Sequence, residues 1–184
     1  MSNNIFLTGK MNIGKTTIIK KVVDELDLSP GGFMVGRDQE VNSWSSFYLL
    51  PTKVFLDNKK EKIKEIKEKG TFAWKDENRE INIASDIFDN YGVKLLNYNL
   101  NEDIIIMDEL GRFELKANKF QNKVIELIKS DIPVLGIIKP EKNVFLNKVR
   151  NIMGQEPLVV KKENKEDIYN YVLKEIKKWR IQND

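Results

Sequence analysis

The sequence predicts an α/β fold of three layers, in which a mainly parallel sheet is flanked by helices on both faces. Two runs, Asp103–Met107 and Pro133–Ile138, are apolar without polar alternation, as in strands that are buried on both faces. Predicted strands alternate with predicted helices along the chain, which is typical of parallel sheets. A length of 184 residues suits one domain, which we expect to span residues 1–184.

The strands are predicted from short apolar runs that end at glycine, proline or charged residues. They are expected at Asn4–Thr8, Gly32–Arg37, Ser46–Leu50, Asp103–Met107, Pro133–Ile138 and Pro157–Lys161. The segment SPGG before the second strand predicts a turn.

The helices are predicted from apolar residues spaced three and four positions apart. They are expected at Lys15–Leu26, 58–69, Asp86–Leu100, Lys119–Ser130 and Glu166–Arg180. The segment 58–69, NKKEKIKEIKEK, has only Ile63 and Ile66 to turn inward, so we interpret it as a surface helix inserted in the domain.

The composition excludes several kinds of chemistry. The chain has no cysteine and no histidine, so it lacks a thiol nucleophile, a cysteine-based zinc site and the usual general base. The net charge of +3 is spread along the sequence, which gives little support for a nucleic-acid partner. No apolar run is long enough to cross a membrane, and the N-terminus lacks a targeting pattern, so we expect a cytoplasmic protein.

Residues Gly9–Thr16, GKMNIGKT, fit the phosphate-binding pattern G-x-x-x-x-G-K-[ST] between a predicted strand and a predicted helix. The glycines let the backbone point successive N–H groups at phosphate oxygens, and the helix adds its N-terminal amides. Lys15 is expected to reach the β- and γ-phosphates during catalysis, and the Thr16 hydroxyl to bind Mg²⁺. Lys10 and Met11 occupy free positions of the pattern. The residues expected at the triphosphate are Gly9, Lys10, Met11, Asn12, Ile13, Gly14, Lys15, Thr16 and Thr17.

A second motif, IIIMDELGRFEL, places Asp108 and Glu109 at the end of a buried strand. Ligands bind outside the carboxyl ends of strands in open α/β sheets. We therefore expect Asp108 to hold Mg²⁺ through its water shell and Glu109 to orient and deprotonate a water molecule. The positive charge that phosphoryl transfer requires is expected from Arg112 first, with Arg37 and Lys139 as the other candidates.

Four segments together resemble one family: TGKMNIGKTT, GGFMVGR, KGTFAW and IIIMDELGRFEL. The family is the small P-loop nucleoside-triphosphatases that were first associated with thermophiles and have a cancer-related human member. Its pattern Asp-Glu-(Ile/Leu)-Gly-(Lys/Arg)-x-Glu falls on residues 108–114. The resemblance implies a RecA-like domain and Mg²⁺-dependent hydrolysis of ATP and GTP with loose base selectivity.

The sequence departs from the pattern of this family in four places. Met11-Asn12 stand where the family usually has Pro-Gly, and Val35-Gly36-Arg37 replace a threonine and an acid. The segments 44–47 (WSSF) and 139–142 (KPEK) also differ. These departures leave the phosphate-binding residues intact and lie near the expected substrate face, where a different acceptor would bind.

Two rival interpretations use the same loop. A nucleotide or polynucleotide kinase would need an arginine-bearing lid, and the chain has only five arginines, although the helix at 58–69 is a candidate cover. The aromatic residues near it are candidates for stacking a base, and core packing is the simpler explanation. These aromatic residues are Trp44, Phe47, Tyr48 and Trp74.

The second rival, a non-catalytic nucleotide-binding scaffold, would have no use for Glu109.

A regulatory GTPase is the third rival. Asp108–Gly111 fits D-x-x-G, and Asn164–Asp167 fits the guanine-reading N-K-x-D. However, Asn-Lys occurs five times in this sequence, and a GTPase would need a strand and a loop where residues 166–180 predict a helix. Asn164 is then better explained as the start of that helix.

Overall fold

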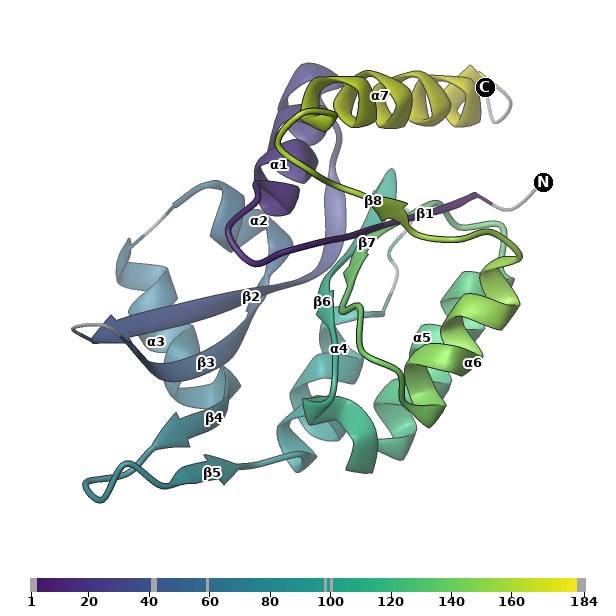
Figure 1. Ribbon diagram of the computed structural model, residues 1–184. Helices are drawn as coiled ribbons and strands as arrows, with labels where there is room; N and C mark the ends of the chain where they lie inside the picture. Colours follow the sequence, from purple (N-terminus) through teal and green to yellow (C-terminus); the bar gives the residue numbers. More distant parts are fainter. Residues whose placement is uncertain (1–2, 41–42, 59, 98, 100, 182–184) are drawn as a thin grey trace.

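The computed structural model describes residues 3–40, 43–58, 60–97, 99 and 101–181. Over these residues the strands form one eight-stranded sheet in the order β5-β4-β3-β2-β6-β7-β1-β8 (Figure 1). The strands are β1 (Asn4–Thr8), β2 (Pro30–Glu40), β3 (Ser43–Pro51), β4 (Thr71–Lys75), β5 (Ile81–Ile83), β6 (Ile104–Leu110), β7 (Val134–Ile138) and β8 (Leu158–Val159).

Helices connect most of these strands. The α-helices are α1 (Lys15–Glu25), α2 (Thr52–Leu56), α3 (Lys60–Gly70), α4 (Val93–Leu95), α5 (Asn118–Lys129), α6 (Val144–Met153) and α7 (Lys165–Ile181). A π-helical turn, η1 (Phe88–Gly92), leads into α4, and a 3₁₀ turn, η2 (Phe113–Lys116), precedes α5.

The sheet has a parallel part and an antiparallel part. Strands β2, β6, β7, β1 and β8 pair in parallel, whereas β3, β4 and β5 continue the sheet from β2 in antiparallel pairs. If the parallel strands are counted in chain order, their order across the sheet is 2-3-4-1-5, and β7 alone separates β1 from β6. This mixed, mostly parallel sheet between helices confirms the predicted fold class, and the strand order is the RecA-like one that the resemblance implied.

Each face of the sheet is covered by its own helices. Helices α1 and α7 lie together on one face, and α4, α5 and α6 lie on the other (Figure 1). Val172 and Ile176 of α7 join the same apolar cluster as Ile18 and Ile19 of α1, and all four side chains are buried. Burial of one such side chain contributes roughly 1.5–3 kcal/mol, so the two clusters hold both helical layers on the sheet.

The structure extends the predicted elements in several places. The prediction missed α2, α6, β4 and β5, and it ended the second strand at Arg37, whereas β2 runs to Glu40 and pairs with β3. The turn predicted at SPGG was wrong, because β2 already begins at Pro30 and its first residues pair with β6. The helix expected over 86–100 ends at Leu95, and residues 98 and 100 of that prediction lie outside the described residues. The lysine- and glutamate-rich helix is present as α3, which packs on β3.

No helix in the described part of the chain combines the length and the apolar character that crossing a membrane requires.

Candidate functional site

The loop between β1 and α1 follows a tight path that glycine makes possible. The backbone has a positive φ at Gly9 (137°), Asn12 (59°) and Gly14 (102°). A Cβ atom at Gly9 would lie 2.6 Å from the carbonyl oxygen of Val160, and one at Gly14 would meet the Lys165 side chain. A side chain at either glycine would therefore strain the loop and displace its neighbours. The loop leads directly into the amides at the start of α1, where anions bind favourably.

The Lys15 side chain curls back over this loop. Its Nζ atom donates hydrogen bonds to the carbonyl oxygens of Gly9 at 3.0 Å and of Lys10 at 2.9 Å. The residue is buried, and this burial lowers the pKa of the ammonium group. A desolvated cation in the centre of an amide-lined loop has a phosphate oxygen as its natural partner.

Strand β6 brings Asp108 to the same edge of the sheet. The Thr16 hydroxyl, at the start of α1, donates a hydrogen bond to Asp108 Oδ2 at 2.9 Å. Asp108 is 6% exposed, and burial together with the neighbouring Glu109 charge raises its pKa to about 7. A buried carboxylate of this kind lacks a full counter-charge, which a cation would supply.

The Thr16–Asp108 pair fits Mg²⁺. This ion takes oxygen ligands and usually binds one or two protein groups together with substrate phosphates and water. Within the described residues, no cluster of three or more acidic side chains forms a metal site of its own. A hydroxyl and a carboxylate that face the phosphate loop are therefore the donor set that the substrate-bound ion would need.

Glu109 is paired with a lysine from the neighbouring strand. Lys139, just after β7, places its Nζ atom 3.2 Å from Glu109 Oε2. The pairing of β6 with β7 shifts register between Asp108 and Leu110. Such an irregularity re-aims side chains at a strand end, and here the two consecutive carboxylates have different partners.

Hydrogen bonds fix the loop that follows β6. The buried Glu114 carboxylate accepts the Gly111 N–H at 3.2 Å with each oxygen, and Asn143 Nδ2 donates to the Gly111 carbonyl at 3.1 Å. The backbone N–H of Lys139 donates to the Leu110 carbonyl at 2.9 Å. These bonds join the β6 loop to the β7 loop, so Glu109 and Lys139 are held on one connected backbone.

Sequence reasoning did not assign roles to Glu114 and Asn143. A signal for Asn143 was available, because it precedes the apolar pattern of α6 and its Oδ1 atom caps that helix by accepting the Leu146 N–H at 2.8 Å. Burial raises the pKa of Glu114 to about 7, and nothing in the sequence reveals that burial. Only the folded loop places this carboxyl under Gly111.

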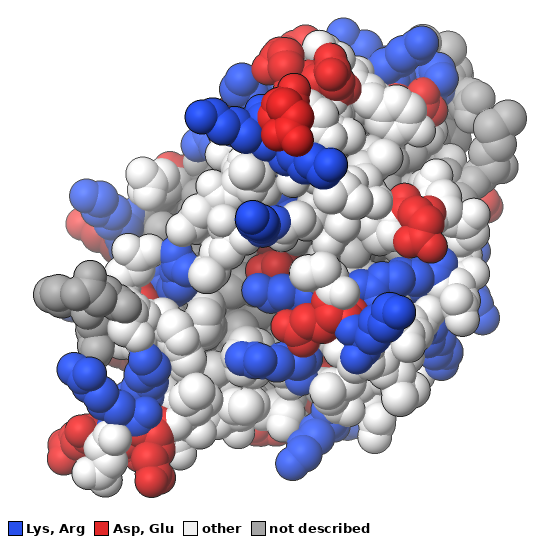
Figure 2. Space-filling model, viewed as in Figure 1, with Lys and Arg blue, Asp and Glu red and all other residues white. Residues whose placement is uncertain are grey.

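One cavity of about 730 Å³ contains most of these groups. The loop and the catalytic candidates form one end, and residues of β2, β3, α2 and α3 form the other. Figure 2 shows basic and acidic side chains spread among uncharged residues over the face of the molecule that Figure 1 presents. The predicted site residues that line the cavity are Met11, Asn12, Gly14, Lys15, Thr16, Thr17, Arg37, Asp108, Glu109 and Lys139.

The three candidate cations have different positions. Lys139 and Arg37 line the cavity, and Arg37 Nη1 lies 3.2 Å from Met11 Sδ of the loop. Arg112 is exposed, and its guanidinium lies 5.4 Å from the ring centroid of Phe113, outside the described lining of the cavity. Of the remaining loop residues, Lys10 offers its backbone carbonyl to Lys15 and points its own side chain into solvent.

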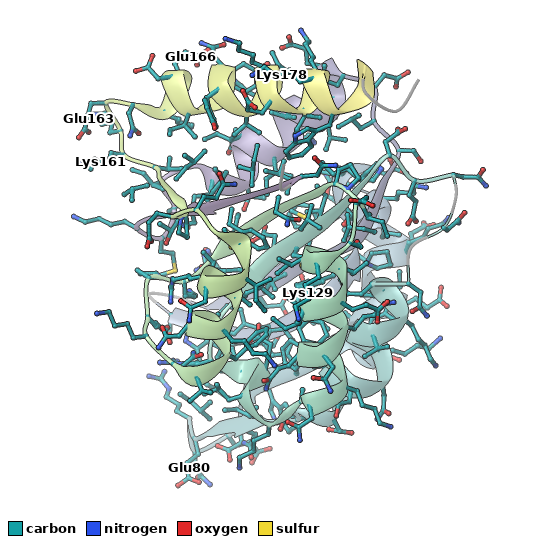
Figure 3. The ribbon with its side chains drawn as sticks, turned by 90° about the vertical axis from the view of Figure 1, so that its right-hand side faces the viewer. Glu80, Lys129, Lys161, Glu163, Glu166 and Lys178 are labelled. Atoms are coloured by element: carbon teal, nitrogen blue, oxygen red, sulfur yellow. The ribbon has the colours of Figure 1, made fainter. Side chains whose placement is uncertain are left out.

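The segment Asn164–Asp167 forms the start of α7 next to the loop. Asn164 Oδ1 accepts the Lys161 N–H at 2.8 Å, and Asn164 Nδ2 donates to the Val159 carbonyl at 2.9 Å, so this side chain closes the preceding turn. Lys165 lies against Gly14, and Asp167 is exposed. Figure 3 shows Lys161, Glu163 and Glu166 at this end of α7.

The glycine loop, its buried lysine and the facing strand-end carboxylate define a P-loop nucleotide-binding protein of RecA-like topology. Residues 4–173 match the NTPase family. The chain therefore belongs to this family of nucleoside-triphosphatase enzymes.

Similar proteins support this assignment. The chain is 31% identical to nucleoside-triphosphatase THEP1 of Methanocaldococcus jannaschii, over 94% of this chain and 96% of that protein. It is 27% identical to nucleoside-triphosphatase THEP1 of Thermotoga maritima, over 94% and 95% of the two chains.

Two solved structures share the fold. The crystal structure of THEP1 from Aquifex aeolicus has a TM-score of 0.65 at 22% identity and covers 92% of this chain and 96% of its own. The solution structure of a human cancer-related nucleoside triphosphatase has a TM-score of 0.65 at 18% identity, with coverage of 93% and 95%.

Proposed function

We propose that this enzyme hydrolyses nucleoside 5′-triphosphates, ATP and GTP among them, to the diphosphate and phosphate in a Mg²⁺-dependent reaction with loose base selectivity. The hydrogen bond between Thr16 and Asp108 is the observation that carries the proposal. It joins the phosphate loop to the acidic strand end, so a metal ion held by both would contact the terminal phosphates.

Each part of the site has a role in this reaction. The loop amides and Lys15 bind the β- and γ-phosphates, and Thr16 with Asp108 would hold Mg²⁺. The ion, when bound, neutralises charge on the β- and γ-phosphate oxygens. Glu109 orients a water molecule and accepts its proton while the water oxygen bonds to the γ-phosphorus. The bond from that phosphorus to the β–γ bridging oxygen breaks, and the diphosphate leaves.

Lys139 is the cation that we assign to the developing charge on the γ-phosphoryl group. Its ammonium lies 3.2 Å from the Glu109 carboxylate. It can therefore reach a γ-phosphoryl group that is attacked by the water molecule on Glu109. Arg37 is the second candidate because it lies against the loop at Met11. Arg112 would have to turn away from the Phe113 ring to take part.

The direct test is phosphate release from ATP, GTP, CTP and UTP, each with Mg²⁺ and with the metal chelated. We expect release from all four at rates within about tenfold of one another, and loss of release without the metal. Full activity in the presence of chelator, or release from one nucleotide alone, would contradict the proposal.

A further inference from the structure

The cavity continues well past the groups that hold the triphosphate. Its volume of about 730 Å³ lies in the range of small-molecule sites, roughly 300–1,000 Å³. We call its far half the distal chamber, and define it by residues of β2, β3, α2 and α3. The distal chamber is lined by Val35, Gln39, Phe47, Tyr48, Phe55 and Ile63.

The strand order shows which end of the nucleotide faces this chamber. Thr16 and Asp108 mark the β–γ end of the triphosphate, and Asp108 lies on β6, between the loop and the strands that carry the chamber. On the opposite side of β1 lies β8, whose following helix sets Lys165 against Gly14. A triphosphate held by the loop would therefore point its γ-phosphate toward the distal chamber and extend its nucleoside toward the start of α7.

The chamber has the chemistry of a nucleoside site. Its walls combine three aromatic rings with aliphatic groups, which suit a planar base. The amide group of Gln39, and that of Asn58 in the segment between α2 and α3 that also lines the cavity, can hydrogen-bond to base edges. Gly36 allows the Tyr48 ring to lie directly on β2, because a Cβ atom there would meet the ring. The buried Tyr48 ring lies between β2 and Lys67, whose Nζ atom is 5.6 Å from the ring centroid, and so forms a rigid part of the wall.

The wall that α3 provides is fixed to the sheet. Lys67 of α3 forms an ion pair with Asp38 of β2, and the Ser46 hydroxyl donates to the same carboxylate at 2.7 Å. Tyr48 Oη lies 3.5 Å from Asp38 Oδ1. These contacts fix α3 against β2, and Ile63 of the same helix lines the cavity.

We propose that the distal chamber binds a second substrate, a nucleoside or nucleoside monophosphate, whose hydroxyl takes the γ-phosphoryl group in place of water. The inference rests on the proposed function, because it uses the same phosphate-binding loop and the same general base, Glu109. The hydroxyl oxygen bonds to the γ-phosphorus, its proton passes to Glu109, and the bond to the β–γ bridging oxygen breaks. The products are the phosphorylated acceptor and the nucleoside diphosphate, so no further reactant is required.

The experiment uses the full chain, Mg²⁺ and a triphosphate labelled at the γ-phosphate, with single nucleosides and nucleoside monophosphates as acceptors. Labelled acceptor and labelled inorganic phosphate are separated and counted. For at least one acceptor we expect transfer to exceed phosphate release by about tenfold. A preference for the monophosphates would assign Arg37 to the acceptor phosphate, whereas equal use of nucleosides would assign recognition to the base and sugar.

A matched pair of variants on α3 tests the location. Ile63→Trp fills the chamber and should lower the ratio of transferred to released phosphate at least tenfold. Ile66→Trp, on the same helix and outside the described lining, should leave that ratio unchanged.

Three experimental results would contradict the second-substrate inference or the proposed function. Hydrolysis without transfer to any acceptor would overturn the second-substrate inference and leave the proposed function standing. Absence of both hydrolysis and transfer would overturn the proposed function itself. A change in base preference of the triphosphate in Ile63→Trp would show that the chamber holds the base of the nucleotide, and would also overturn the inference.

Discussion

The parallel and antiparallel parts of the sheet build their halves of the cavity in different ways. Around β1, β6 and β7, the phosphate end depends on backbone geometry: the positive φ values of the loop, the start of α1 and the ends of buried strands. Around β2 and β3, the distal chamber depends on side chains such as Tyr48, Phe55 and Ile63 that reach in from surface elements.

This difference explains where the chain can vary. Triphosphate binding uses backbone N–H groups, which any sequence that adopts this loop conformation provides. Few side chains are therefore required beyond the glycines, Lys15 and Thr16. The antiparallel part has no such constraint, because side chains on strands and short helices can change while the ladder of hydrogen bonds remains. If the distal chamber binds the acceptor as proposed, residues of the antiparallel part would determine which acceptor is used.

The largest effect on activity should come from substitution of Glu109, the general base at the end of β6. In Glu109→Gln the side chain keeps its size and loses its ability to accept a proton, so kcat should fall about 10²- to 10⁴-fold while nucleotide affinity stays within about threefold. Phosphate release and equilibrium nucleotide binding measure the two quantities. Glu126→Gln, which removes a surface ion pair with Lys123 on α5, is the control and should leave both unchanged. Unaltered turnover in Glu109→Gln would remove this residue from the mechanism.

Glycine substitutions compare the stability of the two parts. Gly32, in β2, has a φ of +83° and meets the Ile106 backbone, so Gly32→Ala should lower the free energy of unfolding by about 3 kcal/mol or more. At Gly36 the three atoms nearest to an added Cβ all belong to the Tyr48 ring, so Gly36→Ala should cost about 1–3 kcal/mol.

Urea unfolding of the single and double variants checks this difference. Because the Tyr48 ring is the obstacle at Gly36, Tyr48→Ala should remove most of the added cost of Gly36→Ala, so the double variant should lose less stability than the sum of the two single losses. Simple additivity of the two substitutions would show that the ring does not explain this glycine.

The pH dependence of stability should report the buried carboxyl below Gly111. The pKa of Glu114 is raised from 4.5 to about 7, so the folded chain keeps a proton that the unfolded chain releases. Its contribution to stability is fully present below about pH 4.5 and is lost as pH rises to about 7, by about 3 kcal/mol. Glu114→Gln keeps an acceptor for the Gly111 N–H and should lose this part of the slope, while the part that comes from Asp108, whose pKa is also raised to about 7, remains. Thermal unfolding from pH 5 to 8 measures it, and identical slopes in both proteins would contradict the assignment.

The smallest effect separates the candidate cations. Lys139→Gln should lower kcat about tenfold with little change in KM, because its ammonium acts on charge that develops in the transition state. Arg112→Gln should change kcat by less than about twofold, since its guanidinium lies over Phe113. Steady-state kinetics of the two variants side by side check the order, and a larger loss in Arg112→Gln would reverse it.

Sequence alone predicted the parallel part well. The runs around Ile105 and Leu135 are apolar throughout, and only a strand covered on both faces requires that. The phosphate-binding loop could be predicted from the sequence because phosphate binding requires glycine, lysine and threonine at fixed spacing. The meeting of Thr16 with Asp108, 92 residues away, followed from the expectation that parallel strands end at one edge.

The antiparallel part was harder to predict because its signals are short. Strand β5 has three residues and α2 has five, which is less than a period-based pattern needs. The segment TFAWK alternates poorly, since Phe72 and Ala73 are both buried in β4. Helix α6 did carry a signal, with the Asn143 cap and Gly154 at φ +67° after its last turn.

The most direct test is a structure of the Glu109→Gln variant with ATP and Mg²⁺. We expect the γ-phosphate to lie between Lys15 and the side chain at position 109 and the ion to lie on Thr16 and Asp108. The adenosine should extend toward Lys165 and leave the distal chamber free. Phosphates bound away from the glycine loop, or adenine seated beside Tyr48, would contradict this expectation.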